Sequence, residues 1–144
     1  MALFAVQVSI GLIMGWVYVA PNFLSEIMPF NILRMLHTNS LIVWLLLGFF
    51  GAAYFLIPEE SEREIYSPKL AYLQLAILVL GTAGVVVTYS FNLFEGNFLL
   101  GKEGREFLEQ PKWVKVGIVV AALIFLYNVT MTVLAGKKTA ITNI

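Results

Sequence analysis

Residues 30–57 read FNILRMLHTNSLIVWLLLGFFGAAYFLI, a run in which Arg34 is the only charged residue and His37 is the only histidine of the chain. The run exceeds the roughly 20 apolar residues that cross a hydrocarbon core of about 30 Å. A helix satisfies its own backbone hydrogen bonds, which the interior of a bilayer demands. This stretch therefore predicts a membrane-spanning helix, and it decides the fold class.

Three further apolar runs accompany it, at residues 1–20, 69–94 and 113–135. Each is long enough to span a bilayer, and continuous runs of this kind differ from the alternating segments of a membrane barrel. All five prolines fall in connections or at helix edges, where a missing amide hydrogen is tolerated. We expect an all-α integral membrane protein with four transmembrane helices, forming one membrane domain over residues 1–144.

The composition agrees with a bilayer and excludes several functions. The chain is 60% hydrophobic, with nine basic and nine acidic residues that cancel, and its mean hydropathy is +0.86. Zero net charge gives no argument for nucleic acid as a partner. There is no cysteine, so disulfides, thiolate metal ligands and covalently attached c-type haem are excluded.

Charge alone does not orient the four spans. The first and third connections share one side of the membrane, and the second shares the other with the C-terminal tail. The excess of basic residues that marks the cytoplasmic side is absent, because five bases face four. These are Arg34, Lys102, Arg105, Lys112 and Lys115 against Arg63, Lys69, Lys137 and Lys138.

His37 is the leading candidate for a functional residue. An ionisable ring within a span is costly and usually has a partner, a ligand or a metal. Neutral imidazole is a standard axial ligand of haem iron, and Arg34, three residues earlier on the same helix face, suits the carboxylate tails of an iron porphyrin. Two alternatives stay open: His37 hydrogen-bonded to a neighbouring helix, and Arg34 extended to the lipid headgroups.

Acidic residues of the connections are a second candidate site. The second connection holds Glu59, Glu60, Glu62 and Glu64, and the third holds Glu103, Glu106 and Glu109. Converging carboxylates can bind calcium, although most acidic residues in loops contact only water.

Two weaker patterns lie within the spans. Gly48, Gly51 and Ala52 would let another helix or a flat ring approach closely, with helix packing the simpler interpretation. Asn128-Val-Thr130 matches a glycosylation pattern but lies in an apolar span, so Asn128, Thr130 and Thr132 more simply bond to backbone or to neighbouring helices.

Six stretches stand out, in order along nearly the whole chain: residues 29–39 (PFNILRMLHTN), 41–44 (LIVW), 58–61 (PEES), 67–70 (SPKL), 104–111 (GREFLEQP) and 136–140 (GKKTA). Together they resemble the cytochrome b subunits of cytochrome c-dependent nitric oxide reductases, which are twelve-helix members of the haem-copper oxidase superfamily. The third connection is similar to the reductases only, whereas the Arg-x-x-His-Thr-Asn stretch is also similar to cbb-type oxidases.

The resemblance implies specific roles. His37 would be one axial ligand of a low-spin haem b, and Arg34 would lie near its propionates. Glu106 would contribute to a calcium site, and Glu109 would lie near a proton entry route. The implied partners are a cytochrome c subunit, the remainder of the large subunit and the lipid bilayer, with no nucleic acid. The implied location is a bacterial inner membrane, with the first and third connections periplasmic.

In the family, the second axial histidine, the ligand of a second haem b and the ligands of a non-haem iron lie on later helices, and none is present here. We therefore expect a partial chain, cut at its C-terminal end and at its start, that supplies half of a haem site to an enzyme reducing nitric oxide to nitrous oxide. The competing interpretations are part of a cbb-type terminal oxidase subunit, and a complete four-helix membrane protein with a structural role.

Overall fold

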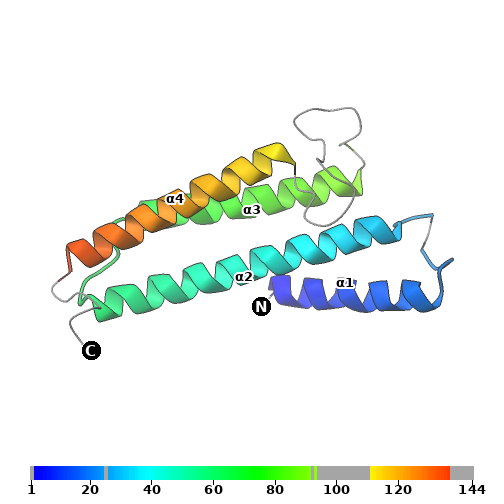
Figure 1. Ribbon diagram of the computed structural model, residues 1–144, viewed down its shortest axis with the longest axis horizontal. Helices are drawn as coiled ribbons and strands as arrows, with labels where there is room; N and C mark the ends of the chain where they lie inside the picture. Colours follow the sequence, from blue (N-terminus) through cyan, green and yellow to red (C-terminus); the bar gives the residue numbers. More distant parts are fainter. Residues whose placement is uncertain (1, 25, 92, 94–110, 137–144) are drawn as a thin grey trace. The chain divides into compact units, whose positions relative to one another are not determined.

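The computed structural model describes residues 2–24, 26–91, 93 and 111–136. These residues contain four α-helices: α1 (Ala2–Val19), α2 (Phe30–Glu60), α3 (Pro68–Ser90) and α4 (Lys112–Leu134) (Figure 1). All four are long and apolar enough to cross a membrane. The predicted all-α membrane fold with four transmembrane helices is confirmed.

The helix ends follow local chemistry. Pro68 is the first residue of α3, where its missing amide hydrogen is harmless. Ser67 precedes it as the cap, because its side-chain oxygen accepts a hydrogen bond from the Leu70 amide at 3.4 Å. Pro29 and Pro111 likewise stand directly before α2 and α4.

Helix α2 continues three residues past the predicted end at Ile57, with Pro58 inside its last turn. The turn closes when the Arg63 amide donates to the Pro58 carbonyl at 3.0 Å and the Glu62 amide to the Glu59 carbonyl at 3.2 Å. Glu62 has a φ of 49°, the left-handed conformation that ends many helices in this bonding pattern. The prediction missed this last turn because hydropathy falls at Pro58 while the backbone stays helical.

The other predicted ends lie close to the observed ones, except that α3 ends at Ser90 and the prediction extended to Phe94. Phe94 lies outside the described residues. By contacts the chain divides into two compact units, residues 1–45 with 81–115, and residues 46–80 with 116–144.

In the first unit, α1 lies antiparallel to the beginning of α2. The rings of Phe4 and Trp44 are 5.1 Å apart, centroid to centroid. The carbonyl oxygen of Gln7 is hydrogen-bonded to Nδ1 of His37. The end of α3 pairs with the start of α4, where the Trp113 indole lies against Gly84. The packing of the first unit therefore places the His37 side chain, which belongs to α2, against α1.

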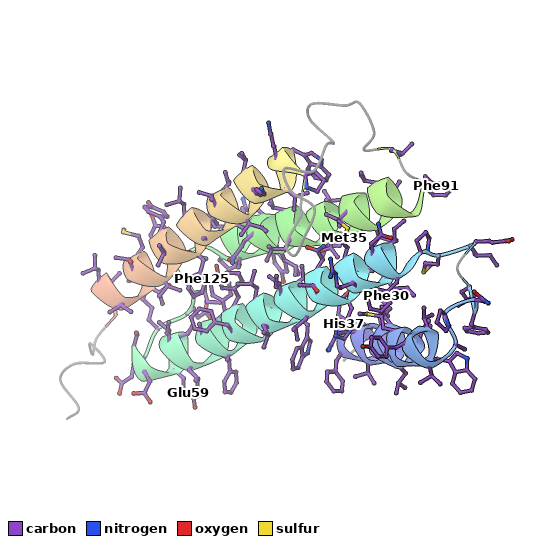
Figure 2. All side chains as sticks on the ribbon, turned by 45° about the vertical axis from the view of Figure 1, so that its right-hand side comes forward. Phe30, Met35, His37, Glu59, Phe91 and Phe125 are labelled. Carbon is purple, nitrogen blue, oxygen red and sulfur yellow. The ribbon has the colours of Figure 1, made fainter. Side chains whose placement is uncertain are left out.

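In the second unit, a core joins α2, α3 and α4 through Phe50, Leu78, Ala121 and Phe125. The ring centroids of Phe50 and Phe125 are 4.6 Å apart. Figure 2 shows Phe125 among the side chains of this core. The packing is made by large apolar side chains, as in other protein interiors.

Buried polar groups tie the second connection to α4. Asn128, with no exposed surface, accepts from the Ser67 amide at 2.9 Å and donates to the Ser67 carbonyl at 3.0 Å. The Thr132 hydroxyl accepts from the Tyr66 amide at 3.0 Å and donates to the Asn128 carbonyl at 2.7 Å. The prediction that Asn128 and Thr132 bond to backbone is confirmed, whereas Thr130 is exposed on α4.

Large apolar side chains cover much of the described surface. Leu12, Tyr18, Phe55 and Leu80 are each more than 65% exposed. In water this much apolar surface would be strongly unfavourable, whereas lipid tails or further protein cover it without cost. The chain is therefore a multi-pass membrane protein.

Candidate functional site

His37 lies on α2, seven residues after Phe30, which places it about 10 Å along the helix axis from the first residue. It is half-buried, and its neighbours Leu33, Met35 and Leu36 are buried. Figure 2 shows the ring on the side of α2 that faces α1. The apolar pattern of α2 thus sets the depth of the ring, and packing in the first unit sets its direction.

The His37 ring is held by a backbone group of α1. Its Nδ1 lies 2.9 Å from the carbonyl oxygen of Gln7. A carbonyl oxygen only accepts, so the proton of a neutral imidazole must sit on Nδ1. The lone pair is then on Nε2, the nitrogen that is left for a metal. A histidine ligand whose other nitrogen donates to a carbonyl is the usual arrangement at metal sites.

Gly11 leaves the space that the ring occupies. A Cβ atom built on Gly11 would lie 2.9 Å from Cε1 and 3.3 Å from Nδ1 of His37, closer than side-chain atoms normally approach. Sequence reasoning missed both Gln7 and Gly11, because a backbone carbonyl leaves no mark on residue type and Gly11 resembles any other glycine of an apolar helix. Only the register between α1 and α2 could have identified them.

Arg34 is half-buried on α2, three residues before His37. Helix α2 runs without a break from Arg34 through His37, and the Arg34 carbonyl also accepts a hydrogen bond from the Thr38 hydroxyl at 2.9 Å. A guanidinium stays charged at any physiological pH and binds carboxylates through paired hydrogen bonds. The helix therefore supplies a cation within one turn of the imidazole.

Of the acidic residues predicted as candidate ligands, those of the second connection lie among the described residues. Glu106 and Glu109 lie outside those residues, as does Glu103. Within the described ranges, no group of three or more His, Cys, Asp or Glu side chains is placed to hold a metal ion. No three of the described carboxylates of the second connection are therefore placed to hold a metal ion.

The predicted small-residue stripe of α2 is open in the described part of the chain. A Cβ built on Gly48 or Gly51 would meet no atom within 4 Å. Gly51 instead lines a mostly apolar recess of about 200 Å³ between α2 and α3, together with the polar side chains Tyr54 and Gln74. The Tyr54 hydroxyl donates to the Gln74 side-chain oxygen at 2.6 Å. Neither His37 nor Arg34 lines this recess.

A haem fits these residues as a group that takes one axial ligand from this chain. The imidazole has its Nδ1 satisfied, lies within a membrane span and has Arg34 three residues before it on the same helix. The chain has one histidine, so it can supply one axial imidazole.

Known proteins resemble this chain along nearly its whole length. Residues 1–143 match the family described as cytochrome c and quinol oxidase polypeptide I. A nitric oxide reductase subunit from Stutzerimonas stutzeri is 51% identical over 148 aligned positions, which cover 99% of this chain and 31% of that relative. The chain thus spans about a third of the length of the curated relative that it matches. On a match along nearly its entire length, the chain belongs to the cytochrome c and quinol oxidase polypeptide I family.

Proposed function

We propose that this chain is the electron-entry part of the large subunit of a membrane-bound nitric oxide reductase, in which His37 is one axial ligand of a low-spin haem b. The observation that carries the proposal is the hydrogen bond from Nδ1 of His37 to the Gln7 carbonyl. It leaves the Nε2 lone pair for iron. Family membership and the 51% identity to a nitric oxide reductase subunit support it.

The residues of the chain have separate roles in this proposal. A bound haem b would supply one-electron transfer. His37 would fix the position of the haem along α2, and its basicity would help to set the reduction potential. Arg34 would pair with the haem propionates through its guanidinium. The apolar side chains around His37 would keep water away from the centre.

In the complete enzyme, electrons from a cytochrome c subunit would reach a site where two nitric oxide molecules, two electrons and two protons give nitrous oxide and water. The second axial histidine of the low-spin haem would come from outside these residues, because His37 is the single histidine here. The ligands of the second haem b and of the non-haem iron would come from outside them as well. The bacterial inner membrane would hold the assembly as one membrane domain.

We also propose roles for two residues of the third connection. Glu106 would be a calcium ligand at the periplasmic face, because carboxylate oxygens are preferred calcium ligands. Glu106→Ala or a calcium chelator is then expected to loosen the cytochrome c subunit or to alter the haem spectra, and indifference to both treatments removes the calcium site. Glu109 would lie near a proton entry route, so Glu109→Gln is expected to slow nitric oxide turnover, and unchanged turnover removes that role.

A terminal oxidase is the second candidate, since the family description includes oxidases. The two enzymes differ downstream: a glutamate among the non-haem iron ligands indicates a reductase, and a histidine cross-linked to tyrosine indicates an oxidase. The name of the 51% identical relative favours the reductase.

The test is His37→Gln in the complete subunit. Glutamine can donate a hydrogen bond to the Gln7 carbonyl, so it would replace a histidine that merely joins α2 to α1. Glutamine is, however, a poor haem ligand. We expect the optical signal of the low-spin haem to disappear while the subunit still assembles. Leu45→Ala, at a position on α2 that is 55% exposed, is the control and should keep the signal.

An unchanged low-spin spectrum in His37→Gln would overturn the proposal. That result would favour a structural role for His37 in a four-helix membrane protein.

A further inference from the structure

The contact between α1 and the His37 ring carries an inference beyond the identity of a ligand. We propose that Gly11, together with the backbone carbonyl of Gln7, sets the tautomer and the orientation of the His37 imidazole, so that Gly11 is a positioning residue for the iron ligand. The inference rests on the proposed function, because it concerns the nitrogen that would bind iron.

A side chain at position 11 would collide with the imidazole. A Cβ atom at position 11 would lie 2.9 Å from Cε1 and 3.3 Å from Nδ1 of His37, and 3.9 Å from Nε2. Carbon atoms in van der Waals contact are about 3.5 to 4.0 Å apart. Any residue larger than glycine would therefore push the ring away from α1 on the side that carries Nδ1 and Cε1.

The effect is specific to one glycine of α1. Gly15 is one helical turn further along, and a Cβ atom built on it would meet nothing within 4 Å. The two residues have the same type, the same helix and the same apolar surroundings in the sequence. They differ in one respect that matters here, which is that Gly11 faces the imidazole.

The Gln7 carbonyl accepts more than one hydrogen bond. In a regular helix, the Gln7 carbonyl accepts the amide hydrogen of the residue four positions later, which is Gly11. The same oxygen also accepts from Nδ1 of His37 at 2.9 Å. A bare backbone beside a helical carbonyl makes room for a group that approaches it from the side of the helix. Gly11 provides this bare backbone directly where the ring lies.

A packing contact besides the histidine holds the register between α1 and α2. The Phe4 ring lies 5.1 Å from the Trp44 ring, centroid to centroid, so a second contact holds the two helices about two turns from the histidine. If a side chain at position 11 displaced the imidazole, α1 could not simply slide to restore the Nδ1 hydrogen bond. The displacement would fall on the ring itself.

The expected consequence is electronic. A hydrogen bond from Nδ1 to a carbonyl raises the basicity of Nε2 and stabilises ferric iron. When that bond is weakened, the reduction potential of the haem rises, and the rotated ring changes the electron paramagnetic resonance spectrum of the ferric centre. The site would still contain histidine and haem.

The experiment compares Gly11→Ala with Gly15→Ala in the complete haem-loaded subunit. For Gly11→Ala we expect a more positive potential of the low-spin haem and a shifted ferric resonance spectrum. For Gly15→Ala both should equal the wild-type values. Equal potentials and spectra in all three proteins would overturn the inference while leaving His37 as a ligand, because that role is tested separately by loss of the signal in His37→Gln.

A second measurement does not depend on the folding of Gly11→Ala. In His37→Gly, imidazole added to the solution can replace the missing side chain, and it can donate to the Gln7 carbonyl. N-methylimidazole can bind iron but cannot donate. We expect imidazole to restore the low-spin signal at a concentration roughly five-fold lower, the ratio that one net hydrogen bond sustains. Equal half-saturating concentrations would contradict the proposed role of the carbonyl.

Discussion

Asn128 joins two parts of the chain that are 61 residues apart in sequence, because its amide meets both backbone groups of Ser67. The side chain is fully buried, and Ser67 is the cap of α3. Asn128 of α4 therefore holds the residue that precedes α3 in place, beside the Thr132 bond to Tyr66. Backbone groups in a membrane protein must be satisfied by protein, since lipid offers no hydrogen bond.

Asn128→Ala should destabilise the protein by about 1 to 3 kcal/mol, because it leaves the Ser67 amide and carbonyl without their partner. Thr130→Ala, at an exposed position two residues further on, should change stability by less than about 0.5 kcal/mol. Thermal unfolding of the two variants in detergent measures the difference. If both melted at the wild-type temperature, the Asn128 tie would not contribute to stability.

At the same scale, His37 and Arg34 are predicted site residues, because a charge or an imidazole within a span is visible from residue type alone. It did not identify Gln7 or Gly11. Gln7 acts through its backbone, and Gly11 acts through the absence of a side chain at a particular contact. Both depend on how α1 lies against α2, which no local pattern in the sequence encodes.

Between elements, α3 and α4 of the first unit meet where the Trp113 indole lies against Gly84. A Cβ atom on Gly84 would overlap the outer edge of that indole, with Cζ2 at 2.9 Å. Gly81, one turn earlier on α3, also faces α4, but the nearest atom to its Cβ would be Val114 Cγ1 at 4.0 Å. A methyl group added at Gly84 would therefore clash with Trp113, whereas one added at Gly81 would fit.

Gly84→Ala should cost about 1 to 3 kcal/mol, because the indole must move out of a packed position. Gly81→Ala should be neutral or stabilising, since alanine favours the helix by about 1 kcal/mol over glycine. Unfolding of both variants by denaturing detergent gives the comparison. Equal stability of the two would show that the Trp113 contact does not limit the approach of α4.

The helices themselves were predictable, because four long apolar runs can satisfy their backbone in a bilayer in only one way. The ends of the helices were harder to predict. Hydropathy placed the end of α2 at Ile57, and the structure carries the helix to Glu60, where a left-handed residue and two backbone hydrogen bonds close the last turn. Hydropathy measures affinity for lipid, whereas a helix ends where its hydrogen bonds end.

For the molecule as a whole, the question is which side of the membrane each connection occupies. Four consecutive spans place the first and third connections together, opposite the second. We propose that the first and third are periplasmic. The chain has no cysteine, so single cysteines in these residues report their side without interference.

Glu26→Cys in the first connection should react with a membrane-impermeant maleimide added to intact cells carrying an otherwise cysteine-free subunit. Glu64→Cys in the second connection should react only after the membrane is opened. Both positions are exposed, so a difference in labelling reports the membrane side. The reverse pattern would place the first and third connections in the cytoplasm and refute the proposed orientation.

The claim on which the account depends is that a nitrogen of His37 is bonded to haem iron. The most direct measurement is electron-nuclear double resonance on the oxidised complete subunit, produced in cells that are supplied with isotopically labelled histidine. The low-spin haem should show the coupling of two histidine nitrogens, and in His37→Ala one of these couplings should vanish together with the low-spin signal. An unaltered pair of couplings in His37→Ala would show that the iron takes its ligands elsewhere.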